Sequence, residues 1–149
     1  MSEISLHIYR YGESCDLPGL SIGVARQAPR GVRKEERASR GYFDVWLPLL
    51  GPSRELLAEN RAGKLSFAEF SKRYRAEMKK PEPRQIITLL AVLASERRIN
   101  LGCFCKDPAT CHRTLLRDLV LAEATKIAAS KPTEVSSSPC YLADFWEES

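Results

Sequence analysis

Hydrophobic and polar residues alternate along the first third of the chain in a way that predicts short β-strands. Residues 4–9 alternate apolar and polar side chains and include β-branched and aromatic members, which predicts a first strand. Residues 20–25 form a more continuous apolar run, which is typical of a central strand. The stretch 42–50 is apolar and rich in β-forming residues at its start, so we expect a third strand or an extended packing segment there.

Apolar residues recur every three or four positions in the second half of the chain, which predicts helices. We expect a short helix that Ser53 caps and Gly63 closes. The stretch Ser66–Glu69 fits a capping box, and Pro81 and Pro83 end the helix that follows it. The next helix is mostly apolar, so we expect it to be well buried. The two apolar stripes are Phe67, Phe70, Tyr74 and Met78, and then Ile86, Ile87, Leu89, Leu90, Val92 and Leu93.

The stretch 99–116 joins a predicted strand to a predicted helix and holds most of the reactive side chains. Its sequence, INLGCFCKDPATCHRTLL, contains three of the five cysteines and one of the two histidines of the chain. We expect a strand over 99–104, whose alternation points Cys103 and Cys105 the same way, roughly 6.6 Å apart. At the carboxyl end of a strand in an α/β sheet, these side chains would line the usual ligand-binding crevice.

The first turn of the helix after this loop has an unusual composition. We expect Thr110 to cap the helix, with Cys111, His112 and Arg113 in the turn that follows. Free backbone N–H groups and the positive end of the helix dipole meet there and favour an anion. A thiol at this place, beside Arg113, should ionise more easily than a free cysteine. The arrangement therefore fits either a reactive thiolate or a phosphate-binding site.

Four interpretations of these cysteines remain open from the residues alone. In the first, which we favour, the stretch is a thiolate or anion-binding site, and in its catalytic version Cys103 or Cys111 is the nucleophile and His112 is the base or orients it. In the second, the cysteines are small buried hydrophobic residues and His112 is a capping side chain. In the third, Cys103, Cys105 and Cys111 bind zinc, although adjacent Cys111 and His112 should diverge around a helix. The fourth is a disulfide. We therefore expect no cofactor, with zinc as the alternative.

A basic segment between residues 26 and 40 offers cations for an anionic ligand. It contains six basic side chains against two acidic ones, and a proline and a glycine predict a loop. Because it follows a predicted strand, this loop would lie at the same sheet edge as the cysteine loop. We expect Arg26, Arg30 and Lys34 to hold an anion together with Arg113. The alternative is an ordinary solvated charged loop.

Composition and charge narrow the class of protein. The chain has 149 residues, of which 44% are hydrophobic and 28% charged, as expected for one globular domain. No run of eighteen apolar residues predicts a membrane span, and the N-terminus lacks the pattern of a signal peptide, so we expect a cytoplasmic protein. Five cysteines do not form a paired disulfide scaffold. The net charge of +4 permits an anionic partner without requiring one.

The character of the chain changes after about residue 130. We expect one α/β domain over residues 1–130, followed by a linker rich in proline and serine and a tail over 131–149. The tail combines acidic residues with Tyr141, Leu142, Phe145 and Trp146. A tail of this kind is typical of a docking segment, so we expect it to bind its own domain or a neighbouring subunit in a homodimer.

The sequence GCFCKDPATCHR resembles domain-of-unknown-function family 488, in particular its YeaO-like branch, over roughly residues 3–125. Members carry a cysteine at the end of a strand and a Cys-His-Arg triplet opening the last helix, which match Cys103 and 111–113. The stretch 24–29 is similar to the family's Asp-Val-Arg-x-x-Pro loop, and 30–34 to the Pro-Arg-Gly-x-x-Lys of the branch. Further similar positions are Trp46, Pro52, Ser53, Phe70 and Tyr74.

The resemblance implies a fold but no particular reaction. It implies an α/β three-layer sandwich with a small, mostly parallel, Rossmann-like sheet, which agrees with the strand and helix patterns. Two positions depart from the family. Val24 stands where the family has an aspartate, and Cys105 where a glutamate is common. Acid–base chemistry by either carboxylate would therefore be absent here or carried by a thiol.

From these observations we predict a cysteine-containing site for a small anionic ligand, phosphate or nucleotide-like, and the residues leave open whether it is a thiol-dependent enzyme. The spacing argues against phosphatases and rhodaneses, because Arg113 follows Cys111 by only two positions. One alternative is a nucleic-acid-binding accessory domain whose basic loop contacts phosphates. Another is a zinc- or redox-responsive protein in which Cys103, Cys105 and Cys111 change state together.

Overall fold

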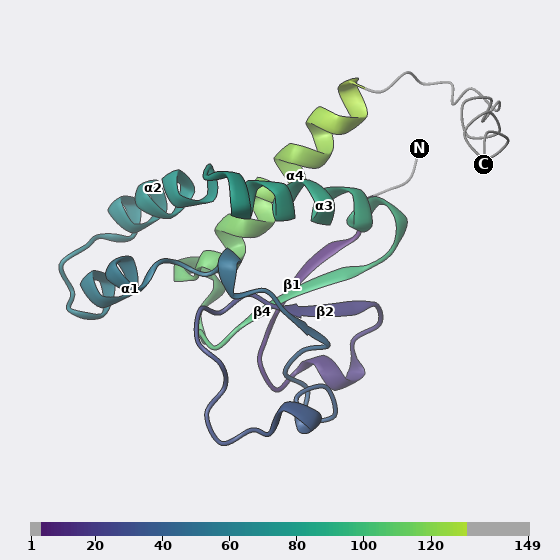
Figure 1. Ribbon diagram of the computed structural model, residues 1–149, viewed down its shortest axis with the longest axis horizontal. Coiled ribbons are helices and arrows are strands. Elements are labelled where there is room, and N and C mark those ends of the chain that lie inside the picture. Colours follow the sequence, from purple (N-terminus) through teal and green to yellow (C-terminus); the bar gives the residue numbers. More distant parts are fainter. Residues whose placement is uncertain (1–3, 131–149) are drawn as a thin grey trace, which may run out of the picture.

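A small parallel sheet organises the computed structural model, which describes residues 4–130 (Figure 1). Its four strands lie in the order β1-β4-β2-β3, and every pair is parallel. The predicted α/β class is confirmed, and the sheet is parallel throughout the described part of the chain. The strands are β1 (Leu6–Arg10), β2 (Leu20–Gly23), β3 (Val45–Trp46) and β4 (Ile99–Cys103).

Strand β4 is central because it pairs with β1 on one side and β2 on the other. All five of its residues are buried, which explains why it reads as an apolar run rather than an alternating pattern. In the parallel register, Cys103 lies opposite Arg10, and Gly102 lies opposite Gly23. The carboxyl ends of the strands therefore meet at one edge, where the cysteine loop begins.

The predicted third strand is much shorter than the stretch 42–50. Only Val45–Trp46 pairs with β2, and a 3₁₀ turn, Pro48–Leu50, follows directly. Pro48 has no N–H to donate to a ladder and begins this turn, which explains the early end of the strand. The other expected strands are present, each ending within two residues of its predicted end.

Four helices follow the predicted order. In the view of Figure 1, α2, α3 and most of α4 lie above the strands, and α1 lies to their left. Helices α3 and α4 pack on each other and on the central strand β4, and α4 also packs on the edge strand β1. The capping prediction at Ser66 is confirmed, because its hydroxyl accepts the Glu69 N–H at 3.2 Å. Leu89 is an exception to the predicted burial, with 58% of its surface exposed. The helices are α1 (Arg54–Arg61), α2 (Phe67–Met78), α3 (Pro81–Glu96) and α4 (His112–Ser130).

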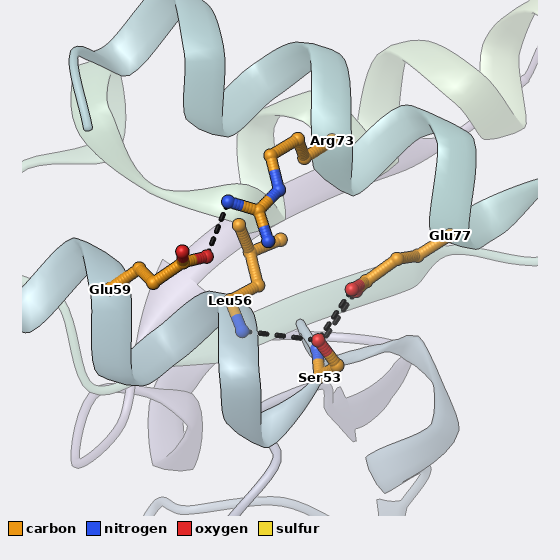
Figure 2. Close-up of polar contacts among 5 residues, drawn as sticks. All are labelled: Ser53, Leu56, Glu59, Arg73 and Glu77. Atoms are coloured by element: carbon orange, nitrogen blue, oxygen red, sulfur yellow. Dashed lines mark hydrogen bonds and ion pairs between the residues drawn. The ribbon is translucent and has the colours of Figure 1, made fainter. Parts of the chain in front are cut away.

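The start of α1 is closed by groups of the protein itself, as Figure 2 shows. The Ser53 hydroxyl accepts the Leu56 N–H at 3.2 Å, which is the predicted cap. Glu77 of α2 then accepts both the Ser53 N–H at 2.8 Å and the Ser53 hydroxyl at 2.5 Å. An ion pair between Arg73 and Glu59 joins the same two helices. These contacts lock α1 onto α2.

Two glycines allow aromatic rings to lie directly on the sheet. A Cβ atom at Gly102 would clash with the Tyr9 ring, and one at Gly23 would clash with the Phe43 ring. These rings belong to a buried cluster that also contains Cys103 and Cys111. Aromatic side chains therefore cover the sheet close to the cysteine loop.

The predicted linker and tail, residues 131–149, lie outside the described residues, so the proposed division of the chain stays a prediction. None of the helices within residues 4–130 has the length and apolar character needed to cross a membrane.

Candidate functional site

Three sulfur atoms and one imidazole nitrogen converge where β4 ends and α4 begins. Cys103 Sγ lies 4.0 Å from Cys105 Sγ and 4.0 Å from His112 Nδ1. Cys111 Sγ lies 3.9 Å from the same nitrogen. The ligand atoms of Cys103, Cys111 and His112 all lie within 4.8 Å of one another. Two predicted catalytic cysteines and the predicted histidine are thus brought together, with Cys105 beside them.

The loop between the strand and the helix has a compact, capped geometry. The Asp107 carboxylate accepts the Ala109 N–H at 2.9 Å and starts a 3₁₀ turn, Pro108–Thr110. The Thr114 hydroxyl donates to the Pro108 carbonyl at 2.6 Å and ties this turn to α4. The short turn folds the chain back so that the residues after it face the end of β4.

The predicted start of the last helix is wrong by one residue, and the difference changes the site. Thr110 is part of the 3₁₀ turn and not the helix cap. Cys111 has an extended backbone, with φ −111° and ψ 143°, and α4 begins at His112. Because Cys111 precedes the helix, its side chain and that of His112 converge on one point. The predicted divergence of these two neighbours, which argued against a metal, is therefore wrong.

The hydrogen bonds of His112 define which nitrogen faces the sulfurs. His112 Nε2 lies 2.8 Å from the carbonyl oxygen of Val24, the residue after β2. A carbonyl only accepts, so Nε2 carries the proton and Nδ1 presents its lone pair to the cysteines. Burial lowers the pKa of His112 and favours this neutral form. The Tyr74 ring packs edge-on against the imidazole at 5.5 Å.

Arg113 is a buried cation beside the cluster, with 3% of its surface exposed. Its Nη1 donates to the Cys105 carbonyl at 2.8 Å and to Cys111 Sγ at 3.4 Å. Its Nε is buried and has no partner, and no ion pair within residues 4–130 involves it. A buried charge is costly unless an opposite charge lies near. The neighbouring sulfurs are the groups that can carry the opposite, negative charge.

The three thiols perturb one another, so a single negative charge is much easier to place than three. The hydrogen bond from Cys103, followed by that from Cys111 and by the nearby charge of Arg113, holds the pKa of Cys105 well below its usual value. The contacts with Cys105 and Cys111, and then burial, raise the pKa of Cys103. For Cys111, the contact with Cys103 lowers the pKa. The contact with Cys105 and burial raise it by more, so the pKa of Cys111 is raised overall, to about 11. Ionisation of one thiol therefore makes ionisation of the other two harder.

Exposure separates the cysteines in a way that sequence reasoning missed. Cys103 and Cys111, the predicted nucleophiles, are 4% and 1% exposed, whereas Cys105 is exposed. The sulfur that solvent reaches is therefore Cys105. The carbonyl of Val24, which orients His112, was also missed, because any residue at that position would supply the same carbonyl group.

The predicted anion-binding residues outside α4 are Arg26, Arg30 and Lys34, and they make their contacts away from this cluster. Arg26 lines a cavity of about 270 Å³ together with Ser53, Glu77 and Lys80, and its Nη1 donates to a backbone carbonyl. Arg30 and Lys34 are exposed. No hydrogen bond or ion pair of the described residues connects Arg26, Arg30 or Lys34 with the cysteines. Their role in holding an anion stays a prediction.

Comparison with known protein families supports the family resemblance that the sequence GCFCKDPATCHR indicates. The family model DUF488-N3a, described as the active DUF488-N3 subclade, matches residues 6–124, so the chain belongs to this family. The matched range contains the whole cysteine–histidine cluster. The match confirms the resemblance to family 488, and the assignment to a YeaO-like branch stays a prediction. Searches of curated proteins and of solved structures give no match.

Proposed function

We propose that this DUF488-N3a member is a metalloprotein whose functional site is a thiolate–zinc centre formed by Cys103, Cys105, Cys111 and His112. The proposal is carried by two sulfurs and one unprotonated imidazole nitrogen, from Cys103, Cys111 and His112, that lie within 4.8 Å of one another. The sulfur of Cys105 lies beside this group, 4.0 Å from Cys103 Sγ. Zinc binds thiolate at about 2.3 Å and imidazole at about 2.0–2.1 Å in a tetrahedron. Ligand atoms around such an ion lie roughly 3.5–3.8 Å apart. The Cys103–Cys105, Cys103–His112 and Cys111–His112 separations of 3.9–4.0 Å are only slightly larger, and Cys103 and Cys111 lie within 4.8 Å of each other.

The surroundings of the cluster match those of a metal site. The His112 Nε2–H donates to the Val24 carbonyl, which is the kind of hydrogen bond that orients a metal-binding histidine. Three thiolates, one neutral imidazole and Zn²⁺ together carry a charge of −1. Arg113 supplies the matching positive charge in direct contact with Cys111 Sγ. Without metal, this buried guanidinium would have only the exposed Cys105 thiolate beside it as compensation.

The position of the centre supports a role beyond structure alone. It lies at the carboxyl edge of a parallel sheet, where α/β proteins bind their ligands. Cys103, Cys111 and His112 are buried, whereas Cys105 faces solvent. Three fixed ligands and one exchangeable position are typical of catalytic zinc. The predicted small anionic ligand would bind the metal on the Cys105 side, where the ion acts as a Lewis acid.

A second candidate is a thiol-dependent site without metal, and one observation favours it. Cys105 is the exposed cysteine of the cluster and lies beside a second sulfur at 4.0 Å. In this alternative the accessible nucleophile is Cys105, with Cys103 as the neighbouring thiol, rather than Cys103 or Cys111 themselves. The buried positions of Cys103 and Cys111 make it the less supported of the two.

Metal analysis combined with cysteine labelling separates the candidates. The full chain is purified without chelator, its metal content is measured by mass spectrometry, and iodoacetamide labelling is read for each cysteine. We expect about one zinc per chain, slow labelling of all three cluster cysteines, and fast labelling of Cys105 after a chelator. The variant C15S is the matched control. Fast labelling of Cys105 with no zinc bound, even after remetallation, would instead establish the thiol-dependent site.

A further inference from the structure

A groove with an apolar floor runs between α2, α3 and α4, away from the cysteine cluster. Its volume is about 300 Å³. The floor is formed by Met78, Ile87, Leu119 and Ala122, which come from all three helices. Met78 and Ile87 are core residues that show only their edges in the groove, whereas Leu119 is half-buried and Ala122 is exposed.

Basic side chains surround this floor. Arg75, Lys79, Arg84 and Lys126 line the groove and are exposed. Glu123 is the one carboxylate in the lining, and it accepts the Thr88 hydroxyl at 3.2 Å. None of the ion pairs formed within the described residues involves the four cations. The groove therefore combines an apolar floor with an excess of unpaired positive charge.

We propose that residues 141–148 of the same chain, YLADFWEE, dock into this groove. The segment carries three acidic side chains, Asp144, Glu147 and Glu148, and no basic one, which complements the cationic rim. It also carries Tyr141, Leu142, Phe145 and Trp146, which would leave water by packing on the apolar floor. A nucleic acid would satisfy the rim but not this floor. The mixed chemistry of the groove therefore favours an acidic, aromatic peptide.

The chain is long enough for docking within one molecule. Helix α4 ends at Ser130, and the floor residue Leu119 lies eleven residues back, roughly 16 Å along the helix. Residues 131–140 connect Ser130 to the docking segment and span at most about 33–36 Å when extended. The connection can therefore return along α4 to the groove. Because it is short, the local concentration of the tail is high, which favours binding in the same chain.

The two indole N–H signals of the full chain give a direct test by NMR. Trp46 donates its indole N–H to the Ala25 carbonyl at 2.8 Å, so its signal is an internal reference. We expect the Trp146 indole signal to be shifted from its random-coil position, and W146A to change the amide signals of groove residues such as Ile87 and Leu119. A random-coil Trp146 signal in the unmodified chain would overturn the proposal.

Charge reversal in the full chain tests the recognition. The double variant K79E/R84E should move the Trp146 signal to its random-coil position, and added salt should have the same effect in the unmodified chain. The control R61E/K64E reverses two exposed charges on α1 and the loop after it, and should leave the signal unchanged. Adding D144K/E147K/E148K to K79E/R84E should restore docking. Equal effects of both double variants would contradict a specific groove.

The oligomeric state and nucleic-acid binding complete the test. Light scattering after size exclusion should give a monomer with a docked Trp146 signal. A dimer that W146A converts to a monomer would overturn docking within one chain and indicate tail exchange between two copies. If short single- or double-stranded nucleic acids shift the groove signals while Trp146 stays at its random-coil position, the groove is a phosphate-binding surface and the proposal is wrong.

Discussion

The N-termini of α1 and α4 show two ways in which a helix start can be satisfied. At α1, the Ser53 hydroxyl caps the helix and Glu77 accepts both polar hydrogens of Ser53. At α4, the residues are Cys111, His112 and Arg113, and the first turn contains no acidic side chain. The start of α1 therefore carries its own anion, whereas the start of α4 carries a buried cation without one.

This difference indicates which helix start has a structural role and which has a site. A helix N-terminus attracts negative charge, and protein groups already supply it at α1. At α4, the negative charge has to come from the sulfur atoms, and three thiolates are stable together only around a cation. The comparison therefore favours an external ligand at α4 and none at α1. Substitutions at four positions test it, in order of decreasing expected effect.

The variant C111S should have the largest effect, because a serine hydroxyl is a poor ligand for zinc. We expect the metal content of the purified full chain to fall from about one ion per chain to nearly none. We also expect the free energy of unfolding to fall by about 3–5 kcal/mol, since Arg113 loses its compensating charge. Metal analysis and urea denaturation measure the two quantities. Full zinc content in C111S would show that Cys111 is not a ligand.

The effect of R113M should be unfavourable with metal bound and neutral or favourable without it. With metal bound, the loss of the positive charge should weaken zinc binding by about 10–100-fold. After chelator treatment, the variant should be as stable as the unmodified chain or more stable by about 1–4 kcal/mol, because the exposed Cys105 alone compensates the buried guanidinium only weakly. Competition with a zinc dye and urea denaturation give the two values. The control R117M removes a partly exposed arginine of the same helix and should affect neither. A loss of stability in both states would mean that Arg113 is structural.

The exposed position Cys105 should be the most replaceable of the ligands. We expect C105S to weaken zinc binding roughly tenfold, about 1.4 kcal/mol, because water can fill an exposed position. C105E should bind more tightly than C105S, since a carboxylate also ligates zinc, and the resemblance implies a glutamate at this position in the family. Zinc-dye competition ranks the three proteins. Equal affinity of C105S and the unmodified chain would remove Cys105 from the ligand set.

The variant S53A should have the smallest effect and should act on α1 alone. Loss of the cap and of the hydroxyl bonded to Glu77 should lower the free energy of unfolding by about 1 kcal/mol. Urea denaturation measures this change. Metal content should not change, because the cavity lined by Ser53 is separate from the cysteine cluster. A parallel loss of zinc would show that the two helix starts are coupled.

The elements that depend on local sequence were predicted well. The cap at Ser53, the cap at Ser66 and the buried β4 strand rest on side-chain identity and periodicity, which act over a few residues. The third strand was overestimated because pairing partners, and not propensity, decide where a strand ends. The start of α4 was misplaced because Asp107 and Thr114 stabilise a 3₁₀ turn before the helix.

The sequence by itself determined the fold class, the family and the stretch that carries the site, because Cys103, Cys111, His112 and Arg113 lie in one short strand–loop–helix unit. The tertiary structure decided how these residues are used. Pairing of β4 with β2 brings the Val24 carbonyl to His112 and thereby sets its tautomer. Packing buries Arg113 without a carboxylate and exposes Cys105. Tautomer, burial and charge balance depend on neighbours distant in sequence, so only the folded chain defines the chemistry of the cluster.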